Sequence, residues 1–105
     1  VVATAGAPAG VVIKNTSGTL KGVSLYNNTT VPVFLKVYNI SAAGVSTAVA
    51  PKYTIGVPPG AWRDVSIQDG AAFTTAMAYL ITGSISTVGT TAVNIDDLHG
   101  IITFL

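Results

Sequence analysis

Hydrophobic and polar residues alternate in short blocks along most of the chain, and turn-forming residues separate the blocks. From residue 11 onward, segments rich in Val, Ile, Thr, Tyr and Phe recur about every ten residues, a spacing typical of β-sandwiches and β-barrels. The pattern predicts strands at 11–15, 20–26, 33–38, 53–57, 62–67, 76–82 and 101–105. The predicted fold is therefore all-β, a sandwich or a barrel with about seven or eight short strands, and seven strands are enough for two packed sheets.

The gaps between the predicted strands carry Gly, Pro, Asn and Asp, which favour turns. The breakers are Ser17-Gly18, Asn27-Asn28, Ala43-Gly44, Pro58-Pro59-Gly60, Asp69-Gly70 and Val88-Gly89. One stretch is ambiguous, because Ala and Met in residues 71–80 favour a helix whereas Phe73, two threonines and Tyr79 favour a strand. We predict a strand there.

The segment 33–38 allows the faces of one strand to be assigned. Side chains alternate along a strand, so its residues divide into two sets that point in opposite directions. The sets are Val33, Leu35 and Val37 on one face, and Phe34, Lys36 and Tyr38 on the other. We expect the first set in the core and the second exposed, with two aromatic rings flanking the lysine stem.

The first ten residues are small and are interrupted by Gly6, Pro8 and Gly10. Such a stretch cannot bury enough surface to fold by itself, so we expect an extended N-terminal arm at 1–12 and one β-sandwich domain at 13–105. A chain of 105 residues is too short for two stable cores.

Composition indicates a protein that packs against something. Half of the residues are hydrophobic and only 9% are charged, against roughly 25% in typical soluble domains. A net charge of +1 gives no electrostatic signature for nucleic acid or an anionic membrane surface, so neither is an expected partner. No apolar run approaches the roughly 18 residues of a membrane span, and the opening lacks the positive region of a signal peptide, so we expect a soluble protein. The sequence contains no cysteine, so we expect no disulfide.

Residues suited to catalysis are scarce: four Asp, no Glu and one His. Asp96, Asp97 and His99 form one cluster that could donate ligands to a metal, but adjacent aspartates before Gly100 fit a solvated turn better. No Gly-x-Ser-x-Gly elbow and no phosphate-binding loop occurs. We therefore predict no catalytic residue, no cofactor and no metal; a small hydrolase would need His99 and an aspartate to converge.

Two further residue classes suggest binding. Aromatic side chains could stack on sugars or bases, although in a small β domain they more often belong to a core or an interface. These aromatics are Trp62, Tyr26, Tyr38, Tyr53 and Tyr79. Glycosylation triplets begin at Asn15, Asn27, Asn28 and Asn39. Such triplets arise by chance where Ser and Thr are abundant, and two adjacent asparagines could hardly both carry a glycan.

Four segments together resemble a recurrent small protein of tailed bacteriophages. They are IKNTSGTLKGVSLYN at 13–27, VFLKVYN at 33–39, IGVPPG at 55–60 and AAFTTAMAYLITG at 71–83. The group has an I-K-x(3)-G-x-L-x-G opening, a Y-L-K-L-Y-N-like strand, a proline-glycine turn and an F-x-x-G-[LI]-x-Y-x-I-T-like strand, in the same order. This chain departs from the pattern where Ala76 and Met77 replace the glycine before the last strand.

The resemblance implies a virion structural protein, a head decoration or cement protein on the capsid exterior that binds the major capsid protein lattice and stabilises it. The fold that it implies is an antiparallel β-sandwich of jelly-roll-like form. It also implies a homo-oligomer on the shell, such as a trimer. Contacts are expected from the arm and from the loops 27–32 and 44–51, which combine exposure with apolar residues. The expected contact residues are Val1, Val2, Pro8, Val11, Val31, Pro32, Val49 and Pro51.

An alternative remains open from the residues. A tail or tail-fibre-associated carbohydrate-binding module would use Trp62 and nearby tyrosines as a sugar platform, and it requires an exposed aromatic face.

Overall fold

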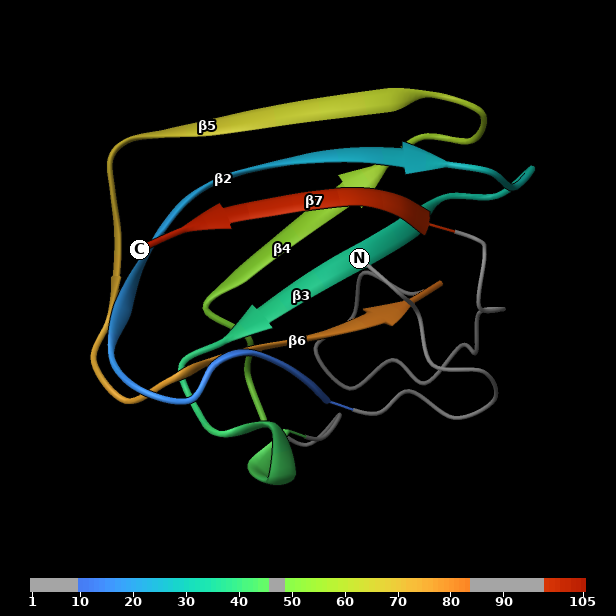
Figure 1. Ribbon diagram of the computed structural model, residues 1–105. Helices are drawn as coiled ribbons and strands as arrows, with labels where there is room; N and C mark the ends of the chain where they lie inside the picture. The colour runs from blue at the N-terminus through green and yellow to red at the C-terminus, as the bar shows by residue number, and fades with distance from the viewer. Residues whose placement is uncertain (1–9, 46–48, 84–97) are drawn as a thin grey trace.

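The computed structural model describes residues 10–45, 49–83 and 98–105. These residues form strands and one short 3-10 helix (Figure 1). The elements are β1 (Val11–Lys14), β2 (Gly18–Asn27), β3 (Val33–Tyr38), η1 (Ala42–Gly44), β4 (Tyr53–Val57), β5 (Trp62–Phe73), β6 (Met77–Thr82) and β7 (Leu98–Phe104). The expectation of an all-β chain is confirmed.

The described strands pair into two antiparallel sheets. One has the order β1-β6-β3-β4 and the other β5-β2-β7. Consecutive strands change sheet at every step except from β3 to β4, an alternation that is jelly-roll-like. The predicted antiparallel sandwich is therefore confirmed.

A single bent ribbon joins the two sheets. Its first half is β1 followed by β2, and its second half is β5 followed by β6. The two halves pair antiparallel from Val11 opposite Tyr79 to Tyr26 opposite Trp62, so the ribbon contributes a strand pair to each sheet. Asn39 holds the corner, donating a hydrogen bond to the Thr74 hydroxyl (3.0 Å) and accepting one from the Thr75 backbone N–H (2.9 Å).

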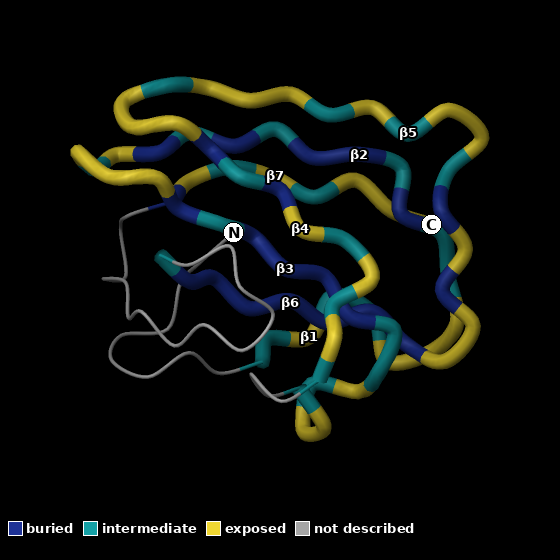
Figure 2. Tube along the Cα trace, turned by 180° about the vertical axis from the view of Figure 1, so that it is seen from behind, coloured by how far each residue is buried: buried dark blue, intermediate teal, exposed yellow. Residues whose placement is uncertain are grey.

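The core lies between the sheets and takes apolar side chains from both. Figure 2 shows buried stretches along strands of both sheets. Its fully buried members include Leu20, Leu25, Val33, Leu35, Val37, Val57, Phe73, Met77 and Leu98. Val33, Leu35 and Val37 lie in this core, as the alternation predicts. At about 25 cal/mol for each Å² of apolar surface removed from water, burial of such side chains is the main force holding the sheets together.

The other face of β3 is buried too, which corrects the expectation of an exposed face. Lys36 and Tyr38 are 0% and 1% exposed, and Phe34 is half-buried. Every residue of the neighbouring β6 is buried, as in a strand covered on both faces. Alternation assigns side chains to opposite faces, but it does not say whether other segments cover a face. Desolvation lowers the pKa of the Lys36 ammonium and raises the pKa of the Tyr38 hydroxyl.

The structure differs from the prediction at three main places. Asp69 and Gly70 do not end a strand; they form a bulge inside β5, where both have positive φ (62° and 76°). Strand β7 begins at Leu98, three residues before the predicted start. Val11 and Val12 pair with β6 and so belong to the sheet, not to an extended arm; residues 1–9 lie outside the described part.

Residues 77–82 form a strand, as predicted, so the helical alternative for 71–80 is excluded.

Two cations close the side of the sandwich where β4 and β5 lie. The Lys52 ammonium donates to the Ala72 carbonyl and lies 4.9 Å from the centroid of the Phe73 ring. At the opposite end of these strands, Arg63 Nη1 donates to the Gly56 carbonyl (2.6 Å). Two of the five basic residues are thus occupied in holding the sheets together. No helix in the described residues is long and apolar enough to cross a membrane.

Candidate functional site

The expected contact residues fall into three groups in the structure. Val1, Val2 and Pro8 lie outside the described residues. Val11, Val49 and Pro51 are half-buried, and Val11 packs against the core from β1. Val31 and Pro32 are exposed neighbours in the loop between β2 and β3. Among the described members of the set, only Val31 and Pro32 therefore form an accessible contact surface together.

The loop that carries Val31 is held against a second loop by Asn27, at the end of β2. The Asn27 side chain is 0% exposed, and its amide Nδ2 donates to the Val31 carbonyl (2.8 Å) and the Val57 carbonyl (2.9 Å). Its Oδ1 accepts from the Thr29 backbone N–H (2.9 Å) and from the Thr29 hydroxyl (2.7 Å). Its backbone N–H donates to the Ala61 carbonyl (3.0 Å). One buried residue, Asn27, thus positions two loops, 28–32 and 58–61. We call these two loops together the tip.

The tip carries no charged residue, and it exposes four apolar residues beside the polar Asn28 and Thr30. Val31 is 56% exposed, and Pro32, Pro58 and Pro59 are exposed as well. Gly60 completes the second loop with a φ of 62°, a left-handed conformation that favours glycine. Because prolines and the Asn27 bonds restrict both loops, little conformational entropy remains to be lost when a partner binds.

A second accessible surface is the solvent side of the β5-β2-β7 sheet, which we call the outer face. The pairing register arranges its residues in three rows across the strands. The rows are Trp62–Tyr26–His99, Asp64–Ser24–Ile101 and Ser66–Gly22–Thr103. All the β5 and β7 members are exposed, and Trp62 and Ile101 are each 65% exposed.

Two side-chain contacts organise the outer face. The Tyr26 and Trp62 rings lie 5.2 Å apart between centroids at an angle of 43°. In the next row, the Ser24 hydroxyl donates to Asp64 Oδ1 at 2.5 Å. The indole is therefore supported from one side by a tyrosine, and the carboxylate is oriented by a serine, while both stay accessible to solvent.

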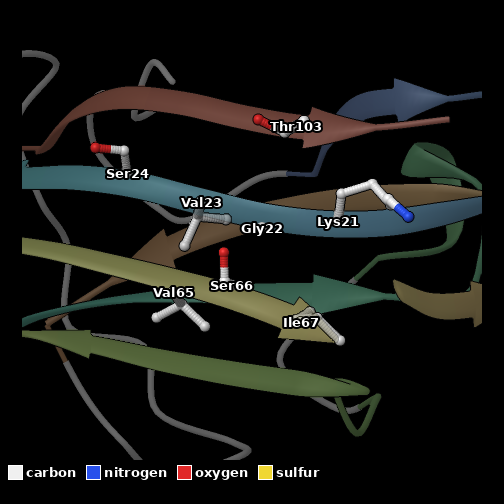
Figure 3. A pocket seen from close by; sticks show the side chains of 8 residues that line it. All are labelled: Lys21, Gly22, Val23, Ser24, Val65, Ser66, Ile67 and Thr103. Atoms are coloured by element: carbon white, nitrogen blue, oxygen red, sulfur yellow. The ribbon is translucent and has the colours of Figure 1, made fainter. Parts of the chain in front are cut away.

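A hollow of about 330 Å³ lies beside the third row. Figure 3 shows the side chains of Lys21, Ser24, Ser66 and Thr103 placed around Gly22 of β2. A Cβ at position 22 would lie 2.4 Å from the Val65 carbonyl oxygen, so no larger residue fits without a shift of the backbone. The hollow is lined by Lys21, Gly22, Val23, Ser24, Val65, Ser66, Ile67 and Thr103.

The remaining aromatic residues do not contribute to the outer face. Tyr38 and Tyr79 are buried, and half-buried Tyr53 lies 6.2 Å from the Phe73 ring, between centroids. Trp62, with Tyr26 beside it, is an exposed aromatic of the kind that the carbohydrate-binding alternative requires; Phe104, at the end of β7, is exposed too but pairs with Leu20, away from the three rows.

Of the three residues considered for metal binding, the structure describes one. Asp96 and Asp97 lie outside the described residues, and His99 is exposed on β7. No group of three or more His, Cys, Asp or Glu side chains suited to a metal occurs among the residues with described positions. Of the glycosylation triplets, Asn27 is buried and Asn39 is bonded at the ribbon corner, which leaves Asn15 and Asn28 exposed.

Comparison with known proteins adds no relative: no protein-family model, no curated protein and no solved structure matches the chain significantly. The site must be judged on its geometry.

Sequence reasoning missed the outer face as a unit. It named Trp62 and Tyr26 among the aromatics of a sugar platform, but not that Asp64 and Ser66 continue the same side of β5 with Ser24 opposite. The alternation in WRDVSIQ carried the signal, since Trp62, Asp64 and Ser66 are the positions that point away from Val65 and Ile67. Pairing of β2 with β5 and β7 could not be deduced from that alternation.

Proposed function

We propose that this chain is a non-enzymatic structural protein of a tailed-phage virion, which decorates the capsid exterior by binding the major capsid protein through its tip. The observation that carries the proposal is the rigid apolar tip, in which Asn27 holds Val31 and Pro32 beside the loop of Pro58 and Pro59. The resemblance of four sequence segments to small phage virion proteins supports the biological setting.

The size of the tip suggests how such a protein would bind. Nine residues form it, whereas a standard protein interface uses roughly 20–30 residues on each side. One tip would therefore bind weakly. Stable decoration would require several linked contacts, from a homo-oligomer such as a trimer or from the arm residues Val1, Val2 and Pro8, because linked weak contacts reinforce one another.

Particles purified from the phage whose genome encodes the chain provide the test. Electron cryomicroscopy should show the sandwich on the outer shell with residues 28–32 and 58–61 facing the lattice. Absence of the protein from the particles would refute the virion role. Attachment through another surface would refute the role of the tip.

A matched pair of variants isolates the tip contact. Val31→Asp places a charge on an exposed side chain and should weaken binding to undecorated capsids by about tenfold or more, as expected for a central contact residue. Val12→Asp is the control, since Val12 is 46% exposed but lies on β1, outside the tip. Equal binding by the two variants would contradict the proposal.

One observation favours the alternative of a carbohydrate-binding module: Trp62 is largely exposed and lies against Tyr26. It belongs to the outer face, a different surface from the tip. A protein bound to a shell through its tip could therefore keep the outer face open to a second ligand.

A further inference from the structure

We infer that the outer face is a binding site for a neutral, extended oligosaccharide, with one sugar ring stacked on Trp62 and the following rings over Asp64, Ser24 and the hollow at Gly22. This inference does not depend on shell attachment by the tip, because the residues involved are different.

The aromatic row supplies the apolar contact that a sugar ring needs. A pyranose ring has a face of C–H groups that packs on an aromatic surface, and indole offers the largest such surface among side chains. Trp62 is 65% exposed, and its contact with Tyr26 restrains the ring before any ligand binds. Restraint of this kind lowers the entropy lost on binding.

The two following rows supply hydrogen-bonding groups along the same line. In the middle row, the Asp64 carboxylate already accepts from Ser24 and retains lone pairs for sugar hydroxyls. In the third row, the hydroxyls of Ser66 and Thr103 and the ammonium of Lys21 border the hollow. From Trp62 to Ser66 the strand advances four residues, or about 14 Å, a length suited to a short oligosaccharide rather than a single sugar.

The pattern of the face distinguishes a sugar from other ligands. A protein partner usually needs a contiguous apolar centre, but here Trp62 and Ile101 lie in different rows with polar side chains between them. Nucleic acid needs a run of basic residues, and Lys21 with His99 does not provide one. Asp64 disfavours an anionic sugar over the middle row. Ring faces with hydroxyl edges match the observed alternation of aromatic and polar rows.

The chain carries its own probe, because Trp62 is its single tryptophan. The full chain would be titrated with cellotriose, xylotriose and N,N′,N″-triacetylchitotriose while tryptophan emission and binding heat are recorded. We expect a saturable change in both signals with at least one of these trisaccharides. Absence of any change at millimolar concentrations of all three would overturn the inference, as would tighter binding of a sialylated or sulfated trisaccharide.

Three variants locate the site. Trp62→Ala, followed by calorimetry, should abolish binding, and Asp64→Ala should weaken it about tenfold through loss of a charge-assisted hydrogen bond. Both side chains are exposed, so the fold should be retained. Val12→Ala, on the other sheet, should bind as the parent does. Unchanged affinity in Trp62→Ala would place the sugar elsewhere and refute the site.

Discussion

Asn27 is the residue whose replacement should reveal most about the tip. Its buried amide makes four side-chain hydrogen bonds, to the carbonyls of Val31 and Val57 and to the N–H and hydroxyl of Thr29. In Asn27→Ala, the buried Val57 carbonyl loses the hydrogen bond that the amide supplies, while the groups of Val31 and Thr29 lie nearer to solvent. The two loops would then lose their common anchor.

The magnitude follows from the burial of these groups. A buried acceptor left without a donor costs about 1–3 kcal/mol, and each remaining bond is worth about 0.5–1.5 kcal/mol, partly recovered by water. We therefore expect Asn27→Ala to lower the free energy of unfolding by about 3 kcal/mol. That is a large part of the 5–15 kcal/mol typical of a domain.

Equilibrium urea unfolding measures the effect, with the slope of the transition checked for a change in the denatured state. Asn28→Ala is the matched control, because Asn28 is the exposed neighbour and should lose less than about 0.5 kcal/mol. A loss below about 1 kcal/mol in Asn27→Ala, or equal losses in the two variants, would refute the assigned role of Asn27.

A second substitution at the same position adds a pH dependence. In Asn27→Asp, a buried carboxyl faces the carbonyl oxygens of Val31 and Val57, so its pKa in the folded state should be raised. The folded state then binds more protons than the unfolded state near neutral pH, and stability falls as pH rises. The free energy of unfolding would be measured for Asn27→Asp and Asn27→Ala at each pH. The difference between the two variants should favour Asn27→Asp more at pH 4 than at pH 7.

Three further substitutions test other parts of the sandwich. Gly22→Ala should lower the free energy of unfolding by about 1–3 kcal/mol and lower the melting temperature, because the new Cβ would lie 2.4 Å from the Val65 carbonyl oxygen. An unchanged melting temperature would contradict this close approach of the two strands. Lys52→Met removes a charge from above the Phe73 ring and should cost about 0.5–1 kcal/mol by urea unfolding, an effect that Lys52→Arg should largely restore. Tyr38→Phe should be neutral or stabilising, because the buried hydroxyl has no hydrogen-bond partner in the described structure. Burial raises the pKa of that hydroxyl, so above about pH 10 it ionises more readily in the unfolded state and the parent protein loses stability. Tyr38→Phe should reduce this loss.

Strand positions were largely predictable from local pattern, because β-branched and aromatic residues between turn signals leave few other structures possible. The segments 33–38 and 53–57 match β3 and β4 to the residue. The failure at Asp69-Gly70 has a physical cause. This dipeptide favours positive φ, and positive φ occurs both in tight turns and in bulges; only pairing with β2 decides between them.

The candidate site was less predictable than the strands. Val31 and Pro32 were chosen correctly as exposed apolar residues, but Asn27 was considered only as a turn residue and a glycosylation triplet. Its actual role depends on the Val57 carbonyl, thirty positions away along the chain. Likewise, Lys36 was expected at the surface because alternation places it on the opposite face of the strand from the core residues, whereas it is fully covered in the structure.

The bulge in the bent ribbon links the fold to the candidate sugar site. Between the pairs Leu20–Ala71 and Gly22–Ser66, residues 67–70 of β5 lie opposite the single residue Lys21 of β2. This mismatch is where the ribbon departs from regular pairing, close to the corner at which it passes from one sheet to the other. Leu20 and Val23 both enter the core, and the two residues between them, Lys21 and Gly22, line the hollow. The hollow beside Ser66 therefore lies at the register shift between β2 and β5, in the ribbon that joins the two sheets. It follows from the strand pairing itself and not from the conformation of a loop.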